Sequence, residues 1–476
     1  MLRVPSKWVH IGLPAVLAGV AATLLASIGL GTPSLWGDEV ATLMSASRPL
    51  PDLMALLGNM DAVHGLYYLT MHAWIAAFGG SPFALRAPSA LALGFAVAGV
   101  VVLVQRFHSR TVALGAGITL ALLPGAFGFA AEARSYAGTV ALAILILVVA
   151  ESTTRSRRRG RWIALAVLTA LGVVWFAYLA LFAATVLGWL AWRRAASRSG
   201  LLASGLVALA VASPVLILAW QQRGQIAWIA DAGVNGAAEV LVAAWFGWWP
   251  LAVLGWAALL WSLIATIRSR RWDSIECAVL MSTLLPLAIL WGASVFAPVL
   301  SPRYLAMCLP GVAIVIALRV HALAQRARLT TVGAAVVLLA VASPALVAER
   351  LPTAHRGSDW AAVASFVEQH AEPGDGVVFD ESGEPWFRPR LALRGYPEAF
   401  AATHDLTGRG LTTESVWDID VAPLTPQALE GERRVWLIER RDLGAADARE
   451  ALEHVGFQPV ESTEFARTVV TLYRVP

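Results

Sequence analysis

Four short stretches of this sequence carry residue types suited to acid, base or anion-binding chemistry, and each lies beside a long apolar run. They are Asp38-Glu39, Asp61 with His64, Glu132-Ala133-Arg134-Ser135-Tyr136, and Ser301-Pro302-Arg303-Tyr304. Carboxylates and histidine accept protons, and the planar fork of an arginine holds a phosphate. If the fold gathers these stretches on one side, they suit a cavity lined by acids and cations.

The elements that must position these residues are membrane helices. Hydrophobic residues make up 58% of the 476 and charged residues only 14%, against about 25% charged in soluble proteins. Runs of about 20 apolar residues, the length that crosses a bilayer, recur along residues 1–349. They predict eleven spans: 11–30, 84–104, 111–129, 136–150, 162–176, 177–192, 200–220, 246–267, 275–297, 303–321 and 330–348. The aromatic sequence Trp175-Phe176-Ala177-Tyr178 predicts a tight hairpin between two short spans.

The charged residues predict the orientation. Basic clusters occur at alternate connections: Arg3/Lys7, Arg106/Arg110, Arg155 to Arg161, Arg193/Arg194/Arg198, Arg268/Arg270/Arg271 and Arg326/Arg328. By the positive-inside rule these clusters are cytoplasmic, so the N-terminus is inside a plasma membrane and the C-terminus outside. Membrane topology therefore explains the basic pI, and no nucleic-acid partner is expected.

One apolar segment must stay on the outer side for this topology to hold. Counting residues 64–80 as a span would place the sequence RSRRRGR outside, so we expect a helix lying in the outer interface. Residues 31–83 then form one long outer loop. The first run, at about 20 residues, is longer than a signal-peptide core, which predicts an uncleaved first span.

The C-terminal residues 350–476 predict a small α/β domain outside the membrane, following a membrane domain at 1–349. They hold 13 basic against 21 acidic residues, whereas residues 1–349 hold 23 against 11. A helix is expected at Asp359–His370, capped by Ser358 or Asp359, and another at 445–455. Strands are expected at 376–379, 434–438 and 468–473. Cys277 and Cys308 lie inside apolar runs and predict no disulfide framework.

Each polar stretch also has a simpler interpretation. Asp38-Glu39 suits a solvated pair, Asp61 a helix cap, and Arg303 a side chain reaching for headgroups; Glu132 can pair with Arg134 across a turn. Independent solvated residues would not need to avoid the cytoplasmic loops, which contain only three acids, Glu151, Asp273 and Glu276. The joint placement on the outer side therefore favours a functional site.

These motifs resemble those of a known family. An Asp-Glu pair after the first span, Asp61-x-x-His64 opening into Gly-Leu-Tyr-Tyr-Leu, and Leu-Arg-Ala-Pro-Ser-Ala-Leu at 85–91 resemble the GT-C superfamily of polytopic glycosyltransferases. The branch is that of protein O-mannosyltransferases and bacterial aminoarabinose transferases. Glu-Ala-Arg-Ser-Tyr at 132–136 and Pro-Arg-Tyr-Leu at 302–305 match further patterns of that branch. Where family members commonly have His-Pro-Pro-Leu, this chain has His64-Gly65-Leu66.

The resemblance implies a GT-C fold and a polyprenyl-phosphate-sugar donor that enters from the membrane. It implies transfer on the outer face, with Asp38 as the base and Glu39 beside it. The surrounding residues would be Asp61, His64, Glu132, Arg134 and Tyr136.

Simple chemistry agrees with a single carboxylate base. A lipid phosphate leaves as a stabilised anion, so no general acid is needed, unlike in a glycosidase. Asp38 as base, with Arg303 beside Tyr304 or Arg134 at the phosphate, would give direct displacement and inversion. No cofactor is required, although Asp38, Asp61 and His64 have ligand types that suit Mn or Mg.

The sequence thus predicts a glycosyltransferase that moves a sugar, expected to be mannose, to a glycolipid, polysaccharide or protein outside the cytoplasm. A polyprenyl-phosphate pentose is the alternative donor. The rival from another class is a transporter or flippase for a lipid-linked sugar. Such proteins place ionisable groups near the bilayer midplane and often have repeated halves. In this sequence ionisable residues within the predicted spans are nearly absent, and no internal repeat is found. A non-catalytic scaffold is a further alternative, which predicts no cost of losing Asp38.

Overall fold

The computed structural model describes residues 12–476 apart from 156–157, 194–196, 233–235, 237, 298, 327–330 and 418–419. Arg3, Lys7, Arg157, Arg194 and Arg328 of the predicted cytoplasmic clusters lie outside the described residues. The chain divides into two compact units. The helical unit comprises residues up to Ile28, Val63–Leu66 and Arg86–Val347, and the sheet unit comprises Gly29–Ala62, Tyr67–Leu85 and Ala348–Pro476.

A helix coincides with each of the eleven predicted spans. They are α1 (Leu13–Ser27), α5 (Pro82–Val104), α6 (Arg110–Leu122) with α7 (Pro124–Ala130), α8 (Tyr136–Arg155), α9 (Arg159–Trp175), α10 (Leu179–Trp192), α11 (Arg198–Gln221), α14 (Trp249–Ser269), α15 (Ile275–Ala293), α16 (Leu309–Arg326) and α17 (Thr331–Ala348). A short helix, α13 (Ala244–Phe246), precedes α14. Within the described residues, six helices are long and apolar enough to cross a membrane, or seven if the bent pair α6 and α7 counts as one. The polytopic helical fold is confirmed.

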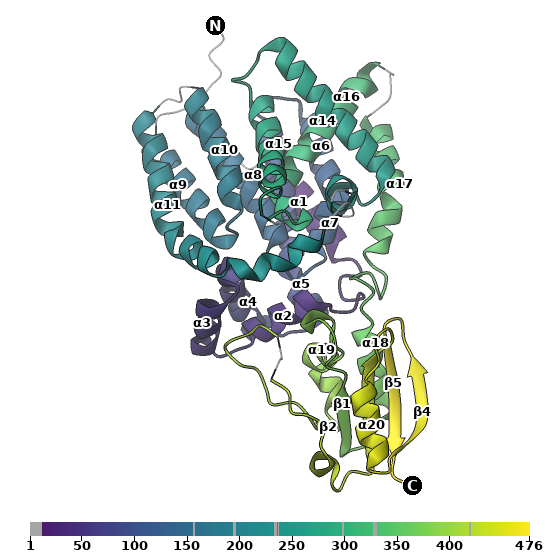
Figure 1. Ribbon diagram of the computed structural model, residues 1–476. Coiled ribbons are helices and arrows are strands. Elements are labelled where there is room, and N and C mark those ends of the chain that lie inside the picture. Colours follow the sequence, from purple (N-terminus) through teal and green to yellow (C-terminus); the bar gives the residue numbers. More distant parts are fainter. Residues whose placement is uncertain are drawn as a thin grey trace. The chain divides into compact units, whose positions relative to one another are not determined.

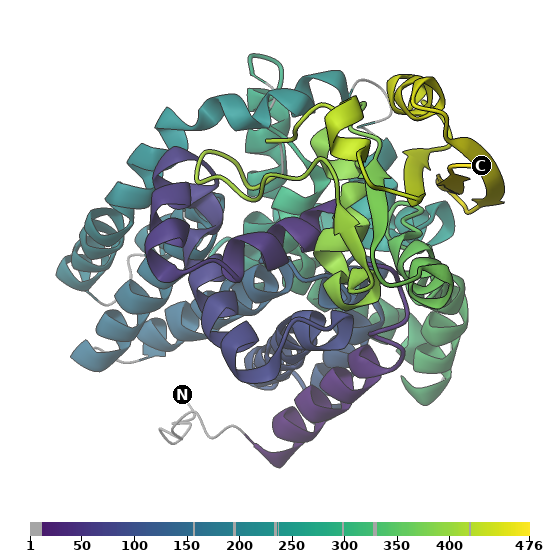
Figure 2. The same cartoon turned by 90° about the horizontal axis from the view of Figure 1, so that it is seen from below.

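Two breaks in these helices have local causes. The predicted span 111–129 bends by 62° between α6 and α7. Pro124 begins α7, and proline both lacks an N–H and pushes the preceding residue out of the helical region, so Leu123 is extended. The predicted hairpin at 175–178 is confirmed, because α9 ends at Trp175 and α10 begins at Leu179. Helices α9 and α11 pack side by side (Figure 1; Figure 2).

The predicted outer loop contains three helices: α2 (Gly37–Ala46), α3 (Leu50–Asn59) and α4 (Gly65–Phe78). Helix α4 occupies the segment expected to lie in the interface. Its 14 residues extend about 21 Å, which is less than the hydrocarbon thickness of about 30 Å.

The C-terminal residues form a five-stranded sheet in the order β2-β1-β3-β5-β4. The strands are β1 (Asp375–Phe379), β2 (Thr403–Asp405), β3 (Arg434–Arg440), β4 (Gln458–Glu464) and β5 (Thr468–Arg474), with helices α18 (Trp360–His370), α19 (Arg390–Gly395) and α20 (Ala446–His454). Strand β1 pairs in parallel with β2 and β3, while β5 is antiparallel to β3 and β4. The predicted α/β domain is confirmed, with β2, β4 and α19 as additional elements.

The residues of β3 alternate between two helical layers. Val435 and Leu437 belong to a core cluster with Leu452 of α20, whereas Trp436 meets Phe366 of α18 edge-on. The period-2 alternation of a strand explains this division. Helices α20 and α18 thus cover opposite faces of the sheet (Figure 1).

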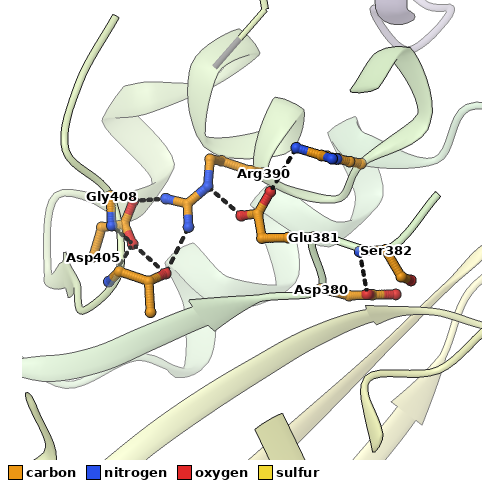
Figure 3. A network of polar contacts seen from close by, with 8 residues as sticks. Asp380, Glu381, Ser382, Arg390, Asp405 and Gly408 are labelled. Atoms are coloured by element: carbon orange, nitrogen blue, oxygen red, sulfur yellow. Dashed lines mark hydrogen bonds and ion pairs between the residues drawn. The ribbon is translucent and has the colours of Figure 1, made fainter. Parts of the chain in front are cut away.

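The buried Arg390 bonds to residues at or after the ends of β1 and β2. Arg390, 1% exposed, donates to Glu381 at 2.5 Å and to Thr407 at 2.6 Å, and it also pairs with Asp405 (Figure 3). Asp380 accepts the backbone N–H of Ser382. Two carboxylates compensate the buried guanidinium, as such burial requires.

The predicted cap of α18 is wrong in its detail. Asp359 occupies the cap position, but its side chain makes no capping bond. Its carboxylate instead accepts the N–H groups of Arg467 and Thr468 and the Thr468 hydroxyl. Ser358 donates to the Leu35 carbonyl at 2.7 Å. Both side chains make contacts with segments more than a hundred residues away, which local sequence does not reveal.

Candidate functional site

The proposed base lies in the first turn of α2. Trp36 precedes the helix, and Asp38 and Glu39 are its second and third residues. The positive end of a helix dipole favours acids there. Asp38 is half-buried and its carbonyl accepts the Thr42 hydroxyl at 3.1 Å. Glu39 is completely buried.

Glu39 pairs with a histidine that the sequence analysis did not single out. His355 Nδ1 lies 3.3 Å from Glu39 Oε2, and His355 is only 4% exposed. Because an ionised carboxylate only accepts, the histidine nitrogen is the donor. Burial raises the pKa of the nearby Glu349 carboxyl, while His355 and Arg350 oppose that rise. Asp38, Glu39 and His355 all belong to the sheet unit.

Asp61, in the same unit, precedes α4. Its φ of 58° places it in the left-handed region, which aspartate tolerates better than most side chains. The Tyr68 hydroxyl, one turn into α4, donates to Asp61 Oδ2 at 2.7 Å. This bond fixes the carboxylate beside its own helix.

His64 and Arg134, two of the residues expected in the site, are in contact in the helical unit. Arg134 Nη2 lies 3.1 Å from His64 Nε2, and Ser135 Oγ lies 3.3 Å from His64 Nδ1. An arginine only donates, so His64 Nε2 must accept and the hydrogen is on Nδ1. The neutral ring thereby orients Arg134, and both residues are buried.

One phenylalanine joins the aromatic members of the predicted site. The ring of Phe176 lies 5.9 Å from the rings of His64 and Tyr136, and 5.6 Å from that of Tyr304. Tyr304 also stacks on Tyr178 at 4.3 Å. Phe176 and Tyr178 belong to the aromatic turn between α9 and α10, a signal that the sequence analysis used only for topology.

The remaining two predicted residues are Glu132, in the turn between α7 and α8, and Arg303, near the start of a helical segment. Glu132 is half-buried between α7 and α8, and its carbonyl accepts the Ser89 hydroxyl at 2.6 Å. Ser89 comes from the 85–91 motif, so this bond connects two of the motifs. Arg303, also half-buried, is in a 3-10 turn, Pro302–Cys308, that leads into α16.

The metal ligands that the sequence suggests as possible are Asp38, Asp61 and His64. No group of three or more metal-ligating side chains gathers among the described residues. His64 in particular has both ring nitrogens in hydrogen-bond contact with Arg134 and Ser135, which leaves no lone pair directed at a cation. His64 Nε2 instead accepts a hydrogen bond from the Arg134 guanidinium.

The comparisons with known proteins bear on the fold. No family model and no curated protein matches the sequence. Two solved structures of ArnT from Cupriavidus metallidurans match at 13% identity over 96% of this chain and 97% of theirs: the apo state with a TM-score of 0.61, and the complex with undecaprenyl phosphate with 0.58. The apo Archaeoglobus fulgidus oligosaccharyltransferase matches at 12% identity and a TM-score of 0.50, over 89% of this chain and 69% of that one. The chain therefore has the GT-C fold that its motifs implied.

Proposed function

We propose that the chain is a plasma-membrane glycosyltransferase that moves a sugar from a polyprenyl-phosphate donor to an acceptor outside the cytoplasm. The observation that carries the proposal is the likeness to ArnT, which extends over 96% of the chain and includes a structure bound to undecaprenyl phosphate. The N-terminus would be cytoplasmic and the C-terminal domain extracytoplasmic. The acceptor would be a glycolipid, a polysaccharide or a protein.

In the proposed reaction an acceptor hydroxyl attacks the anomeric carbon while Asp38 takes its proton. The bond from that carbon to the phosphate oxygen breaks, and the electron pair leaves with the lipid phosphate. Arg303 or Arg134 would stabilise the departing anion, since a charge-assisted bond is stronger where water is excluded. Direct displacement inverts the anomeric carbon.

The proposed sugar is mannose. A pentose is the second candidate, because the motifs also resemble those of aminoarabinose transferases. Purified protein should be offered both polyprenyl-phosphate sugars and assayed for release of polyprenyl phosphate. Transfer consumes the donor, whereas a transporter or flippase would move it across a vesicle membrane intact. Movement of intact donor without release of phosphate would contradict the proposal.

Replacing the base tests the assignment of Asp38. Asp38→Asn keeps the size of the side chain but cannot accept a proton, so transfer should fall about a hundredfold or more with donor binding preserved. The matched control is Asp52→Asn, which changes an exposed acid in the first turn of α3. Near-normal turnover by folded Asp38→Asn protein would remove Asp38 from the reaction.

A further inference from the structure

The segment that leads into α2 is bonded at successive residues to the C-terminal domain. The Ser34 N–H donates to the Pro352 carbonyl at 2.8 Å, and the Ala361 N–H donates to the Ser34 hydroxyl at 3.1 Å. The carbonyl of the next residue, Leu35, accepts the Ser358 hydroxyl at 2.7 Å. The backbone before Asp38 therefore has fixed partners more than three hundred residues away in sequence.

Three more contacts continue along the same segment. The Leu35 N–H donates to the Tyr396 hydroxyl oxygen at 2.8 Å, and the Arg356 guanidinium lies 5.4 Å from the Trp36 ring centre. Gly37 approaches Trp386 so closely that an added Cβ would lie 2.4 Å from its carbonyl oxygen. Only glycine fits this approach, so α2 begins directly against the C-terminal domain.

One further contact joins α2 itself to the C-terminal domain: the pair of Glu39, in the helix, and His355. Both side chains are almost fully buried, and a buried carboxylate needs a compensating donor. Removing His355 would take one buried donor away from Glu39, which is one residue from the proposed base. The cost would appear as movement of the first turn of α2.

Another part of the α/β domain that contacts α2 is the chain that follows β1. Trp386 and Tyr396 follow β1, whose neighbours β2 and β3 lie on its two sides and are parallel to it. In open parallel sheets, the chain after such a strand, at the switch point, usually binds a ligand. Here that chain, including α19, packs on α2.

We infer that the C-terminal domain positions the Asp38 helix for catalysis and that His355 is the positioning residue. The inference rests on the proposed function. His355 acts through Glu39 and touches no substrate in this role. A misplacement of about 1 Å near a reacting group lowers turnover by up to about a hundredfold without preventing substrate binding.

The test uses full-length protein in nanodiscs, with donor Kd and single-turnover transfer measured separately. His355→Ala and Gly37→Ala should each lower the transfer rate tenfold or more, with the donor Kd within twofold of wild type. His355→Asn should recover part of the rate, because its amide can donate to Glu39. Hydrogen exchange of the amides in residues 36–46 should rise in His355→Ala, while exchange in β3 stays unchanged.

Matched controls come from the same unit. His404 also pairs with a glutamate, Glu432, at 2.9 Å, but on the surface. Gly58 at the end of α3 has no atom within 4 Å of an added Cβ. His404→Ala and Gly58→Ala should therefore keep the wild-type rate.

Wild-type transfer by folded His355→Ala and Gly37→Ala proteins would overturn the inference, as would equal losses in the two controls. If Asp38→Asn is inactive while these variants are normal, only the positioning role fails. If Asp38→Asn is itself active, the proposed base fails.

Discussion

The two units hold their polar groups in different ways. In the helical unit, hydroxyls such as those of Thr119 and Thr139 donate to carbonyls one turn back in their own helix, which satisfies them without a distant partner. In the sheet unit, charged side chains such as Asp359 and Arg390 each bind several partners outside their own helix. The helical unit contains both proposed phosphate-binding arginines, and the sheet unit contains Asp38. Donor binding and proton removal should therefore respond to different sets of substitutions.

The largest expected effect in the helical unit is at Arg303. Arg303→Ala should lower transfer about a hundredfold and weaken donor binding, because a two-pronged contact to phosphate is lost. Arg303→Lys keeps the charge without the fork and should retain partial activity. Donor binding and single-turnover transfer are the measurements.

Arg223 provides the matched control for this arginine. It is exposed, follows α11 and lies over the Trp220 ring at 4.7 Å. Arg223→Ala should keep wild-type transfer. If Arg303→Ala also keeps wild-type transfer, Arg303 is only a membrane anchor. The helical unit would then lack the cation that is proposed to bind the donor phosphate.

A smaller effect is expected where His64 orients Arg134. His64→Phe keeps a ring beside Phe176 but removes the acceptor, so the donor Kd should rise about tenfold, the equivalent of 1.4 kcal/mol. His64→Gln restores an acceptor and should bind better than His64→Phe. His108→Phe, which alters a histidine of the same unit that contacts Glu276, is the control. If His64→Phe lowered turnover but left the donor Kd unchanged, the assignment of donor binding to the helical unit would be contradicted.

The smallest effect concerns the sheet unit at Glu349. Burial raises the pKa of this carboxyl, so the folded protein favours its neutral form. The stability that this form contributes is lost as pH rises through the raised pKa. Glu349→Gln cannot ionise, so the variant should melt about 2 °C above wild type at pH 7.5, and the difference should shrink towards pH 4.5. Glu368→Gln, on an exposed position of α18, should show no such trend. If the difference in melting temperature between Glu349→Gln and wild type grew as pH fell, the raised pKa of Glu349 would be contradicted.

Sequence patterning predicted the elements whose signals are local. The aromatic turn after Trp175 and the strand 434–438 were found because apolar runs and their interruptions need no partner to be recognised. Strand β4 was missed because its sequence, QPVESTE, is polar and almost wholly exposed. It is a strand because β5 supplies its hydrogen bonds.

The candidate site was predictable only in part for a similar reason. The motifs identified His64 and Arg134 as members of one candidate site, and the two side chains are in contact. The motifs did not identify the partner of Glu39, because His355 is 316 residues away and its local sequence has no distinguishing pattern. Motifs identify residue types, whereas buried pairs between distant segments depend on the tertiary fold.

The polar sequence of β4 also affects how the domain meets other molecules. An edge strand offers unpaired backbone groups to any neighbouring chain. Here Pro459 removes one donor, the register shifts between Pro459 and Glu461, and the opposite edge, β2, is only three residues long. Both edge strands thus have features that disfavour pairing with a strand of another molecule.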